Sequence, residues 1–453
     1  MGEQQSRNTR TGISGVKNLL PLMQAALPED LLQLLQLTGR IAGDLSTRAF
    51  IVGGVIRDIL LGRKSLDIDV VIEGDAMRMA EALAPHAVDK LVFNRAFTTA
   101  TVPLRDGFHI DFAAARTETY DAPGALPTVS PATIEQDLRR RDFTINSACA
   151  SLVPASFGEV SDPHGGLRDM EIGLLKVLHD GSFVDDPTRI IRGIKYANRL
   201  KFVFDHATLE LAEEAICDGC FKTISPHRLT DELRILFVEQ MPWGAIWDLA
   251  QLCVLTSVSP YLSLSHNALP ILQRIESLEG NLRGCLPEGY RHWIARLLLF
   301  MGNVPASELT SSLAFFDLDK NEASIVSQFI TRREDIASGL NGLDRATDSD
   351  LFELFSSIPA EAGVVIVATR RNKSAARAFE RYWSALSTVR LQISGEDVKE
   401  MGLEEGPMVG EVLRSVLGAR INGKIKGRQA ELTMACELVT QANERLKNEQ
   451  RER

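Results

Sequence analysis

The chain has 453 residues, of which 24% are charged and 6% aromatic. At about 100–200 residues per domain, this length predicts two to four domains, and the ordinary composition excludes a wholly disordered or low-complexity chain. Six Cys exclude a disulfide scaffold and favour a reducing cytoplasm. The net charge of −10, summed over the whole chain, argues against a nucleic-acid partner because phosphate binding requires a basic surface.

The hydrophobic segments argue against a membrane location. The longest apolar runs, 295–301 and 362–368, are far shorter than the roughly 18 residues that span a bilayer. The N-terminus lacks the charged-then-apolar layout of a signal peptide. We therefore expect a cytoplasmic protein with no membrane partner, and no obligate protein partner is evident.

Hydrophobic periodicity divides the chain into a mixed N-terminal part and a helical remainder. A Leu-rich helical pattern over 16–45 leads into 46–180, where short strands and helices alternate. From about residue 181 onward, strand signals almost vanish. The predicted fold class is therefore α+β, a mixed-sheet head followed by an all-α remainder. In the head, we expect strands at 49–52, 66–72, 96–103 and 108–114, and helices at 55–61 and 76–83.

Two carboxylates lie two residues apart on the second expected strand. Asp67 and Asp69 leave the same face of a strand, and carboxylates held this close repel unless a cation lies between them. Hard oxygen ligands of this kind suit Mg²⁺. Taken alone, the spacing also suits an exposed strand edge with two solvated acids. The apolar residues around them favour a rigid metal site with Asp67 and Asp69 as ligands.

A glycine pair before a helix adds a phosphate-binding feature. Gly53 and Gly54 allow close backbone approach, and the helix that follows directs its N-terminus at an anion. Arg57 is expected in the first turn of that helix. Together with the acid pair, this order suggests a nucleoside triphosphate and a metal.

At this point the sequence resembles a known family. The segments FIVGGVIRDILLG (50–62) and LDIDVV (66–71) resemble the signature of class II nucleotidyltransferases of the polymerase β superfamily, which comprise the tRNA CCA-adding enzymes and bacterial poly(A) polymerases. Further segments match family motifs in the same order: RRDFTIN (140–146), DDPTRIIR (185–192), SPHRLTDEL (225–233) and the tail from 393 to 407.

The resemblance implies nucleotidyl transfer to an RNA 3′ end. A 3′-hydroxyl would attack the α-phosphorus of a nucleoside triphosphate, with bound metal activating the hydroxyl and neutralising the leaving oxygens. Such sites often take a third carboxylate from a neighbouring strand, and Asp111 is the candidate. An equally suitable interpretation of Asp111 is an ion pair with Arg116. The predicted catalytic residues are Asp67, Asp69 and Asp111.

An arginine run follows in the second motif. Arg139, Arg140 and Arg141 precede an expected helix over 143–152, and the corresponding family motif contacts the triphosphate. Arginine suits this role because its planar fork binds phosphate bidentately. Asn146 is expected to face the same site one turn later. A solvated charged surface is the alternative interpretation of the run.

Asp186 and Arg189 are three residues apart, which places them on one face of an expected helix. Cytosine and adenine both offer an amino donor beside a ring-nitrogen acceptor, whereas uracil and guanine present the opposite order. A carboxylate and a guanidinium can therefore accept C and A and reject U and G. A surface ion pair is the alternative. Arg192 and Lys195 continue this face towards the triphosphate.

The sequence departs from the family pattern at two positions. Lys195 stands where members usually carry Arg, so the charge is kept but the fork is lost. Asp185 stands where Glu is usual. Arg228 and Glu232, four residues apart, are expected to brace the helices that follow the head. The irregular segment 115–127 occupies the same position in the sequence as a loop of the resembled family that helps to switch specificity from C to A.

Basic clusters in the helical part are candidate contacts for RNA phosphates. They include Arg370, Arg371 and Lys373, and near the C-terminus Lys424, Lys426 and Arg428. The predicted domains are a leader helix (1–45), the catalytic head (46–180), a neck holding the nucleobase template (181–245), a body (246–385) and a tRNA-binding tail (386–453).

The sequence thus predicts a Mg²⁺-dependent enzyme that adds CMP, AMP or both from CTP and ATP to the 3′ end of tRNA. A CC-only or A-only enzyme, a poly(A) polymerase, a catalytically silent RNA-binding relative and a small-molecule nucleotidyltransferase remain alternatives. The negative net charge is a sum over the whole chain, whereas the cationic residues cluster in the motifs. The net charge therefore does not exclude a nucleic-acid partner. The predicted nucleotide-binding residues are Gly53, Gly54, Arg57, Arg140, Arg141, Asn146, Asp186, Arg189, Arg192 and Lys195.

Overall fold

A computed structural model describes residues 10–64, 67–95, 98–239, 242–341 and 343–452. Leu66, the first residue of one expected strand, and residues 96–97, the first of another, lie outside the described residues. The described chain forms two compact units, 1–236 with 244–258, and 237–243 with 259–453. Each unit is described by itself below.

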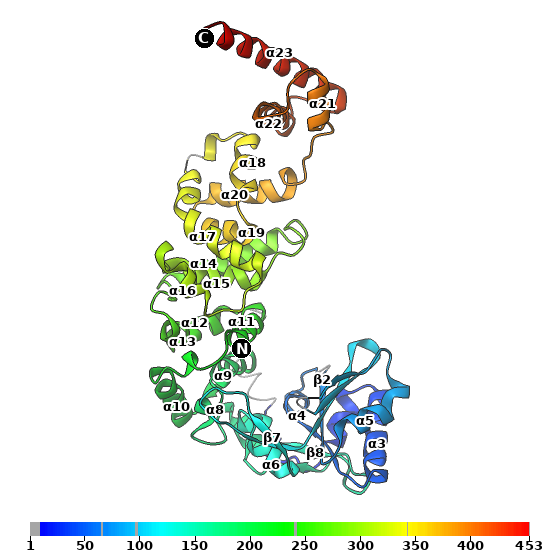
Figure 1. The fold of residues 1–453 in the computed structure, drawn as a ribbon. Helices are drawn as coiled ribbons and strands as arrows, with labels where there is room; N and C mark the ends of the chain where they lie inside the picture. Colours follow the sequence, from blue (N-terminus) through cyan, green and yellow to red (C-terminus); the bar gives the residue numbers. More distant parts are fainter. Residues whose placement is uncertain (1–9, 65–66, 96–97, 240–241, 342, 453) are drawn as a thin grey trace. The chain divides into compact units, whose positions relative to one another are not determined.

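The first unit is built on a seven-stranded sheet (Figure 1). Its strand order is β3-β4-β5-β2-β1-β8-β9, and within it only the pair β2–β5 is described as parallel. Its strands are β1 (Ala49–Val52), β2 (Asp67–Ile72), β3 (Val92–Asn94), β4 (Thr99–Pro103), β5 (His109–Ala114), β8 (Cys149–Ser151) and β9 (Val160–Ser161). The mixed sheet confirms the predicted fold class of the head.

Alternating side chains explain why β2 forms where it does. Ile68 and Val70 are fully buried, whereas Asp67 is exposed and Asp69 is half-buried. One face of the strand therefore packs into the core and the other presents carboxylates, as period-2 patterning requires. The head's remaining elements are α2 (Leu20–Ala26), α3 (Glu29–Asp44), α4 (Gly54–Leu60), α5 (Ala76–Leu83), α6 (Ile134–Arg139), α7 (Gly166–Ile172) and the hairpin β6 (Arg116–Thr119) with β7 (Thr128–Pro131).

Two local predictions in the head need correction. The pattern over 16–45 is two helices, because Pro28 separates α2 from α3. The helix expected over 143–152 is wrong. Residues Thr144–Asn146 form a single 3₁₀ turn, and β8 follows, buried between β1 and β9. A short apolar run does not distinguish a buried strand from a buried helix, and here pairing with β1 decides.

Beyond the sheet, the first unit continues as a helical array. It contains α8 (Ser182–Asp185), α9 (Thr188–Leu200), α10 (His206–Cys217), α11 (Pro226–Val238), α12 (Trp243–Gln251) and α13 (Val254–Val258). The two-residue strand β11 (Val203–Phe204) pairs in parallel with β10 (Leu174–Leu175).

The second unit is helical throughout its described part. Asp319 and Glu322 form a capping box that begins α17, a helix of 20 residues. Its helices are α14 (Ala268–Asn281), α15 (His292–Phe300), α16 (Leu309–Leu313), α17 (Lys320–Gly339), α18 (Asp348–Ser356), α19 (Ala360–Thr369), α20 (Lys373–Arg381), a π-helical turn (Tyr382–Leu386), α21 (Gly395–Glu400), α22 (Pro407–Ile421) and α23 (Arg428–Glu452).

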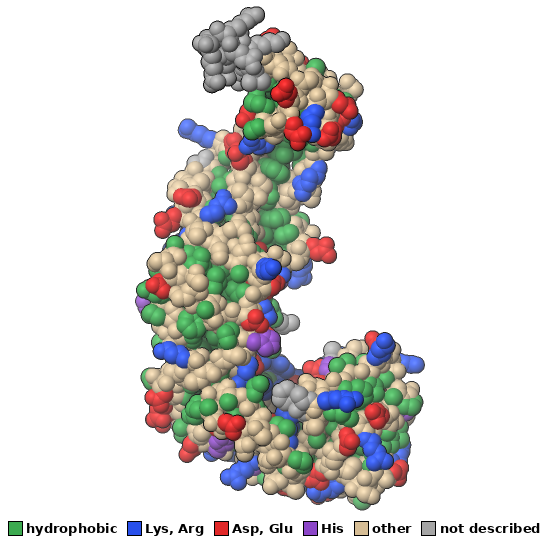
Figure 2. Space-filling model, viewed as in Figure 1, with side chains coloured by type: hydrophobic (Ala, Val, Ile, Leu, Met, Phe, Trp, Pro, Cys, Tyr) green, Lys and Arg blue, Asp and Glu red, His purple; other side chains and the backbone are tan. Residues whose placement is uncertain are grey.

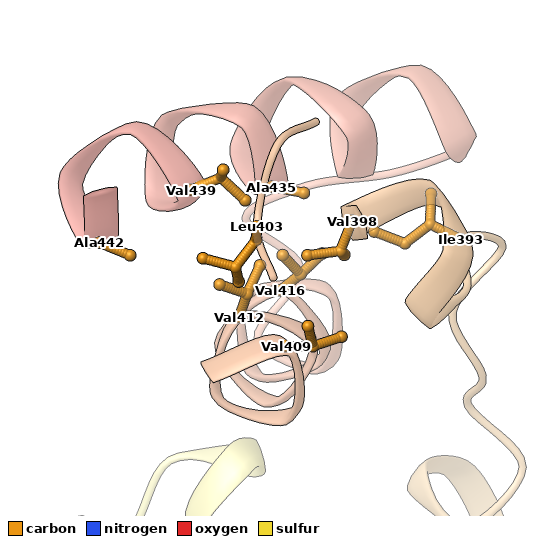
Figure 3. Packing of buried hydrophobic residues seen from close by; sticks show 9 residues of the cluster. All are labelled: Ile393, Val398, Leu403, Val409, Val412, Val416, Ala435, Val439 and Ala442. Atoms are coloured by element: carbon orange, nitrogen blue, oxygen red, sulfur yellow. The ribbon is translucent and has the colours of Figure 1, made fainter. Parts of the chain in front are cut away.

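The C-terminal helices share a hydrophobic core of their own. Side chains of α21, α22 and α23 converge in Figure 3, among them the fully buried Val398, Val416 and Ala435. Glu431 is also fully buried, and it accepts hydrogen bonds from Arg420 and from the backbone N–H groups of Gln392 and Ile393. The carboxylate thereby fastens the start of α23 to α22 and to the segment before α21.

Among the described residues, no single helix is long and apolar enough to cross a membrane. The pair α18 and α19 meets the length and composition requirements together but is bent by 113°. Every residue of α19 except Thr369 is buried.

Candidate active site

One pocket of about 480 Å³ in the first unit gathers most of the predicted site residues. Cationic side chains outnumber acidic ones along its wall, so it suits an anionic ligand. The predicted residues that line it are Gly53, Gly54, Arg57, Asp69, Arg140, Arg141, Asn146, Asp186, Arg189, Arg192 and Lys195. The other predicted residues, Asp67 and Asp111, lie beside Asp69 on the sheet and outside this wall.

The carboxylates are brought together by the pairing of β2 with β5. Asp69 lies opposite Asp111, and Asp67 lies opposite His109. The His109 Nε2 atom is 3.3 Å from Oδ1 of Asp67 and 3.5 Å from Oδ2 of Asp111. Asp111 also accepts a hydrogen bond from the Thr101 hydroxyl.

The electrostatics of Asp69 fit a bound cation. Burial raises the pKa of Asp69, Arg141 opposes this, and the charges of Asp111 and Asp67 raise the pKa further. In the described part of the chain, no three His, Cys, Asp or Glu side chains are grouped to hold a metal by themselves. A hard divalent cation held by one or two carboxylates takes its remaining ligands from water and substrate phosphate, and Asp67 and Asp69 fit that arrangement.

The glycine pair lets backbone, acid and arginine approach closely. Gly53 has a φ of +73°, and a Cβ atom there would lie 2.9 Å from Nη1 of Arg141 and 3.3 Å from Oδ2 of Asp69. Any side chain at this position would displace one of these groups. Gly53 therefore allows the Asp69 carboxylate and the Arg141 guanidinium to lie next to the backbone at this position.

Arg57 is the fourth residue of the seven-residue helix α4, where the first turn of the helix meets the last. Its side chain is buried, with Nη1 donating to Asn146 at 2.8 Å and Nε donating to Asp58 at 2.9 Å. The guanidinium also lies over the ring of Tyr196, 5.0 Å from the centroid. These partners hold Arg57 in the pocket wall and connect the head to α9.

The two arginines of the second motif share one buried acid. Asp137, which is fully buried, accepts hydrogen bonds from Arg140 at 2.7 Å and from Arg141 at 3.0 Å. Burial alone raises the pKa of Asp137, but Arg141 and Arg140 outweigh it and hold the pKa below its usual value. Arg140 also donates to Glu118 at 2.8 Å. Sequence reasoning missed Asp137, although its three- and four-residue spacing before the arginines on a helix was a usable signal.

Asp142 is a second buried acid that sequence reasoning missed. Arg192 donates to it at 2.7 and 3.0 Å, and Asn146 donates to it at 2.9 Å. Burial opposes ionisation, yet the Arg192 charge and the hydrogen bond from Asn146 hold the pKa of Asp142 well below its usual range. The carboxylate thus ties the head motif to α9.

Asp186 and Arg189 both line the pocket, but not as two positions on one helix face. Asp186 is extended and precedes α9, where its Oδ1 atom accepts from the Thr188 N–H and hydroxyl at 3.0 and 2.6 Å. It therefore lies ahead of the helix, whose N-cap is Pro187, and binds the first helical residue, so the predicted helical spacing is wrong. Arg189 follows in the first turn and donates to the Ser182 hydroxyl at 2.7 Å and to the Arg140 carbonyl at 2.9 Å.

Lys195 on α9 faces an acid from α11. Its Nζ atom is 3.7 Å from Oε2 of Glu232, and Arg192 is 4.0 Å from the other oxygen. Burial raises the pKa of Glu232 and the two cations oppose that shift. Glu232 therefore joins α11 to the cationic face of α9.

A mixed-sheet head with paired carboxylates beside a cationic pocket is the framework of a nucleotidyltransferase, and comparison with known proteins narrows the class. Residues 49–176 match the Poly A polymerase head domain. The A-adding tRNA nucleotidyltransferase of Halalkalibacterium halodurans is 30% identical over 422 residues, which cover 93% of this chain and 95% of that protein. The chain therefore belongs to the class II tRNA nucleotidyltransferases, a family of metal-dependent enzymes.

Two further similarities extend over nearly the whole chain. The A-adding tRNA nucleotidyltransferase of Geobacter sulfurreducens is 30% identical over 94% of this chain, which spans about half, 49%, of that longer protein. The Thermotoga maritima CCA-adding enzyme complexed with tRNA is similar in structure, with a TM-score of 0.75 and 28% identity, covering 92% of this chain and 98% of that chain.

Proposed function

We propose that this chain adds AMP from ATP to the 3′ end of tRNA, with Mg²⁺ as the metal, in the cytoplasm. The observation that carries the proposal is the pocket itself, which has the carboxylate Asp69 and the Asp186/Arg189 pair on one continuous wall. The wall thus combines a group that can hold a metal with groups that can read a base. The two curated relatives named above, from Geobacter sulfurreducens and Halalkalibacterium halodurans, bear the name A-adding, which supports AMP as the nucleotide. The Thermotoga maritima structure, similar over 92% of this chain, is a CCA-adding enzyme, so CMP addition has to be tested alongside.

Each part of the pocket has a role in this proposal. Asp67 and Asp69 hold the Mg²⁺, with Asp111 as the third carboxylate. The metal, when bound, lowers the pKa of the attacking 3′-hydroxyl and neutralises charge on the phosphates. Arg140, Arg141, Arg192 and Lys195 bind the triphosphate, and the close backbone approach at Gly53 and Gly54 leaves room for it. Arg57 and Asn146 brace the wall.

Base selection is assigned to Asp186 and Arg189. The carboxylate accepts from the amino group of adenine or cytosine, and the guanidinium donates to the adjacent ring nitrogen. The helical remainder is proposed to hold tRNA. In chain order, the proposed domains are a leader (1–45), a head (46–180), a neck (181–245), a body (246–385) and a tRNA-binding tail (386–453). Acidic and basic side chains are interspersed on the face drawn in Figure 2. This distribution favours binding of RNA phosphates by individual basic residues over binding by one extended basic surface.

The decisive experiment uses three tRNA transcripts that end before the first C, after the second C, or with complete CCA. Each is incubated with Mg²⁺ and ATP, CTP or both. We expect AMP addition to the second transcript only and no CMP addition. Addition of CMP to the first transcript would replace the A-only assignment with CC or CCA addition.

A poly(A) polymerase is the second candidate, because the family match is to the Poly A polymerase head domain. The same assay with an unrelated RNA separates the two. Long A tails on that RNA would favour the polymerase, whereas addition of one AMP to tRNA alone supports the proposal.

A further inference from the structure

A cation of the neck lies directly behind the proposed base-reading carboxylate. Arg228 belongs to α11, and its Nη2 atom is 2.6 Å from Oδ1 of Asp186. The two donors of Thr188 reach the same oxygen, so Oδ2 is the oxygen that a nucleobase amino group can reach. Arg228 is not among the described residues that line the pocket. Its effect on a nucleotide must therefore pass through the groups that it holds, of which Asp186 is one.

The same guanidinium holds a second acceptor, on the segment that joins β6 to β7. Nη1 of Arg228 donates to the carbonyl oxygen of Gly124 at 2.9 Å. This docked segment, residues 120–127, begins and ends at the pocket, where Tyr120 and Pro127 form part of the wall. One guanidinium therefore connects the carboxylate with a segment that itself contacts the nucleotide site.

The docked segment is fixed at Gly124 by a close approach that only glycine permits. Gly124 has a φ of +69°, and a Cβ atom there would lie 2.5 Å from Oγ1 of Thr223 and 3.0 Å from Cγ2 of Ile224. Its N–H donates to the carbonyl of Val184 at 3.1 Å. Val184 is two residues before Asp186, so the segment docks on the helix that leads into the base-reading position.

We propose that Arg228 is a positioning residue that sets nucleotide selectivity, because it clamps Asp186 and the docked segment to each other. The inference rests on the proposed base-reading role of Asp186. A guanidinium presents donors on separate nitrogens in a fixed plane and can serve both acceptors at once, whereas an ammonium group is a compact charge. Without the clamp, the Asp186 carboxylate keeps only its hydrogen bonds from Thr188 and loses its link to the docked segment. The pocket then distinguishes adenine from guanine less well.

The test compares Arg228→Lys, Arg228→Gln and Gly124→Ala with wild type in the full-length protein. The matched control is Arg234→Lys, since Arg234 lies on the same helix and faces Asp231. Three quantities are measured: AMP against GMP incorporation on a tRNA transcript ending after the second C, equilibrium binding of fluorescent ATP and GTP analogues, and hydrogen exchange of residues 120–127. Thermal unfolding identifies variants that fail to fold.

For both Arg228 variants, we expect the preference for ATP over GTP to fall about 10-fold, the size of one charge-assisted hydrogen bond. Hydrogen exchange of the docked segment should become faster. Gly124→Ala should reproduce both effects, and Arg234→Lys should show neither. Because Arg228→Lys keeps the charge, a merely electrostatic role predicts full retention of selectivity in that variant.

Unchanged selectivity and unchanged exchange in a folded Arg228→Lys protein would overturn the clamp. If Arg228→Gln does not fold, Arg228→Lys and Gly124→Ala decide. If wild type incorporates no nucleotide, the proposed function fails, while the binding preference and the exchange rates still decide whether Arg228 joins Asp186 to the docked segment.

Discussion

Asp69 and Asp111 lie directly opposite each other on the parallel strands β2 and β5. Their mutual repulsion adds to the burial that raises the pKa of Asp69, so in the absence of metal this pair destabilises the folded protein. A divalent cation bound between the carboxylates would relieve this repulsion, which is why the pair is the candidate metal site.

The first prediction concerns this conflict between stability and activity. Asp69→Asn should lower nucleotide incorporation by about 10²–10³-fold or more, because a group that stabilises charge in the transition state is lost. The same variant should unfold at a higher temperature than wild type in EDTA. The raised pKa means that the folded state prefers a neutral group at this position, and Asn is neutral at every pH.

Asp106→Asn provides the matched control for Asp69→Asn. Asp106 lies in the turn between β4 and β5 with a φ of +56°, which Asn tolerates. It should change neither activity nor the metal dependence of unfolding. An Asp69→Asn protein with wild-type turnover, measured with Mg²⁺ titrated over a wide range, would contradict the metal assignment.

The second prediction concerns the acid beneath the two arginines. Asp137→Asn should destabilise the protein by about 3 kcal/mol, since removing one partner of a buried ion pair leaves the other uncompensated. It should also raise the KM for ATP, because Arg140 and Arg141 lose the group that orients them. Urea unfolding and steady-state kinetics measure the two effects, with the exposed Glu81→Gln as control.

Asp137 also predicts a pH dependence of stability. The folded-state pKa lies below the ordinary carboxyl value, so the stabilisation is complete above about pH 4 and is lost as the pH falls through the folded-state pKa. Asp137→Asn should therefore approach wild-type stability at strongly acid pH. A constant difference between the two proteins from pH 7 to pH 2 would contradict this account.

The sequence supports inference only where chemistry is local. Asp67 and Asp69 are two residues apart, so a strand alone places them on one face. Asp142 and Arg192 are 50 residues apart, and a separation of this length does not predict that they form a pair. Asp186 shows the opposite failure. Its spacing to Arg189 predicts that both lie on one helix, but Asp186 is extended and lies ahead of α9, where its side chain accepts from Thr188.

Long-range docking is the part of the site that spacing could not predict. The Pro and Gly residues predict an irregular segment over 115–127. The prediction holds for the part after Thr119, whereas Arg116–Thr119 form strand β6, and the hydrogen bond between Gly124 and Arg228 spans 104 positions. Likewise, the apolar run of β8 is too short for periodicity to distinguish a strand from a helix. The strand forms because it pairs with β1, which is a long-range contact.

The third prediction concerns base selection. Asp186→Ala should reduce discrimination between ATP and GTP by about 10–100-fold, the range for losing one good pair of contacts to a base edge. Asp185→Asn is the matched control, since Asp185 is adjacent but faces His179 at 3.6 Å. The measurement is single-turnover incorporation with each of the four nucleoside triphosphates. Equal discrimination in Asp186→Ala and wild type would remove Asp186 from base reading.

The last prediction places RNA phosphates on the turn between α22 and α23. Lys424 and Lys426 are exposed there, and the flanking Gly423 and Gly427 have φ values of +70° and +84° that shape the turn. Each lysine that neutralises a phosphate releases a counterion, so affinity falls with salt in proportion to the number of contacts. Replacing both with Ala should weaken tRNA binding and reduce the slope of log K against log salt by about 1.5.

Lys399 offers the control for those two lysines within the same helical cluster. It is ion-paired with Glu396 at 2.9 Å and with Glu405 at 3.3 Å, so its charge is already compensated by the protein. Lys399→Ala should leave the salt slope unchanged. Binding is measured by fluorescence anisotropy of labelled tRNA between roughly 50 and 300 mM salt, a range over which the Debye length changes about 2.5-fold. A slope that stays at the wild-type value in the double variant would place the RNA elsewhere on the helical part.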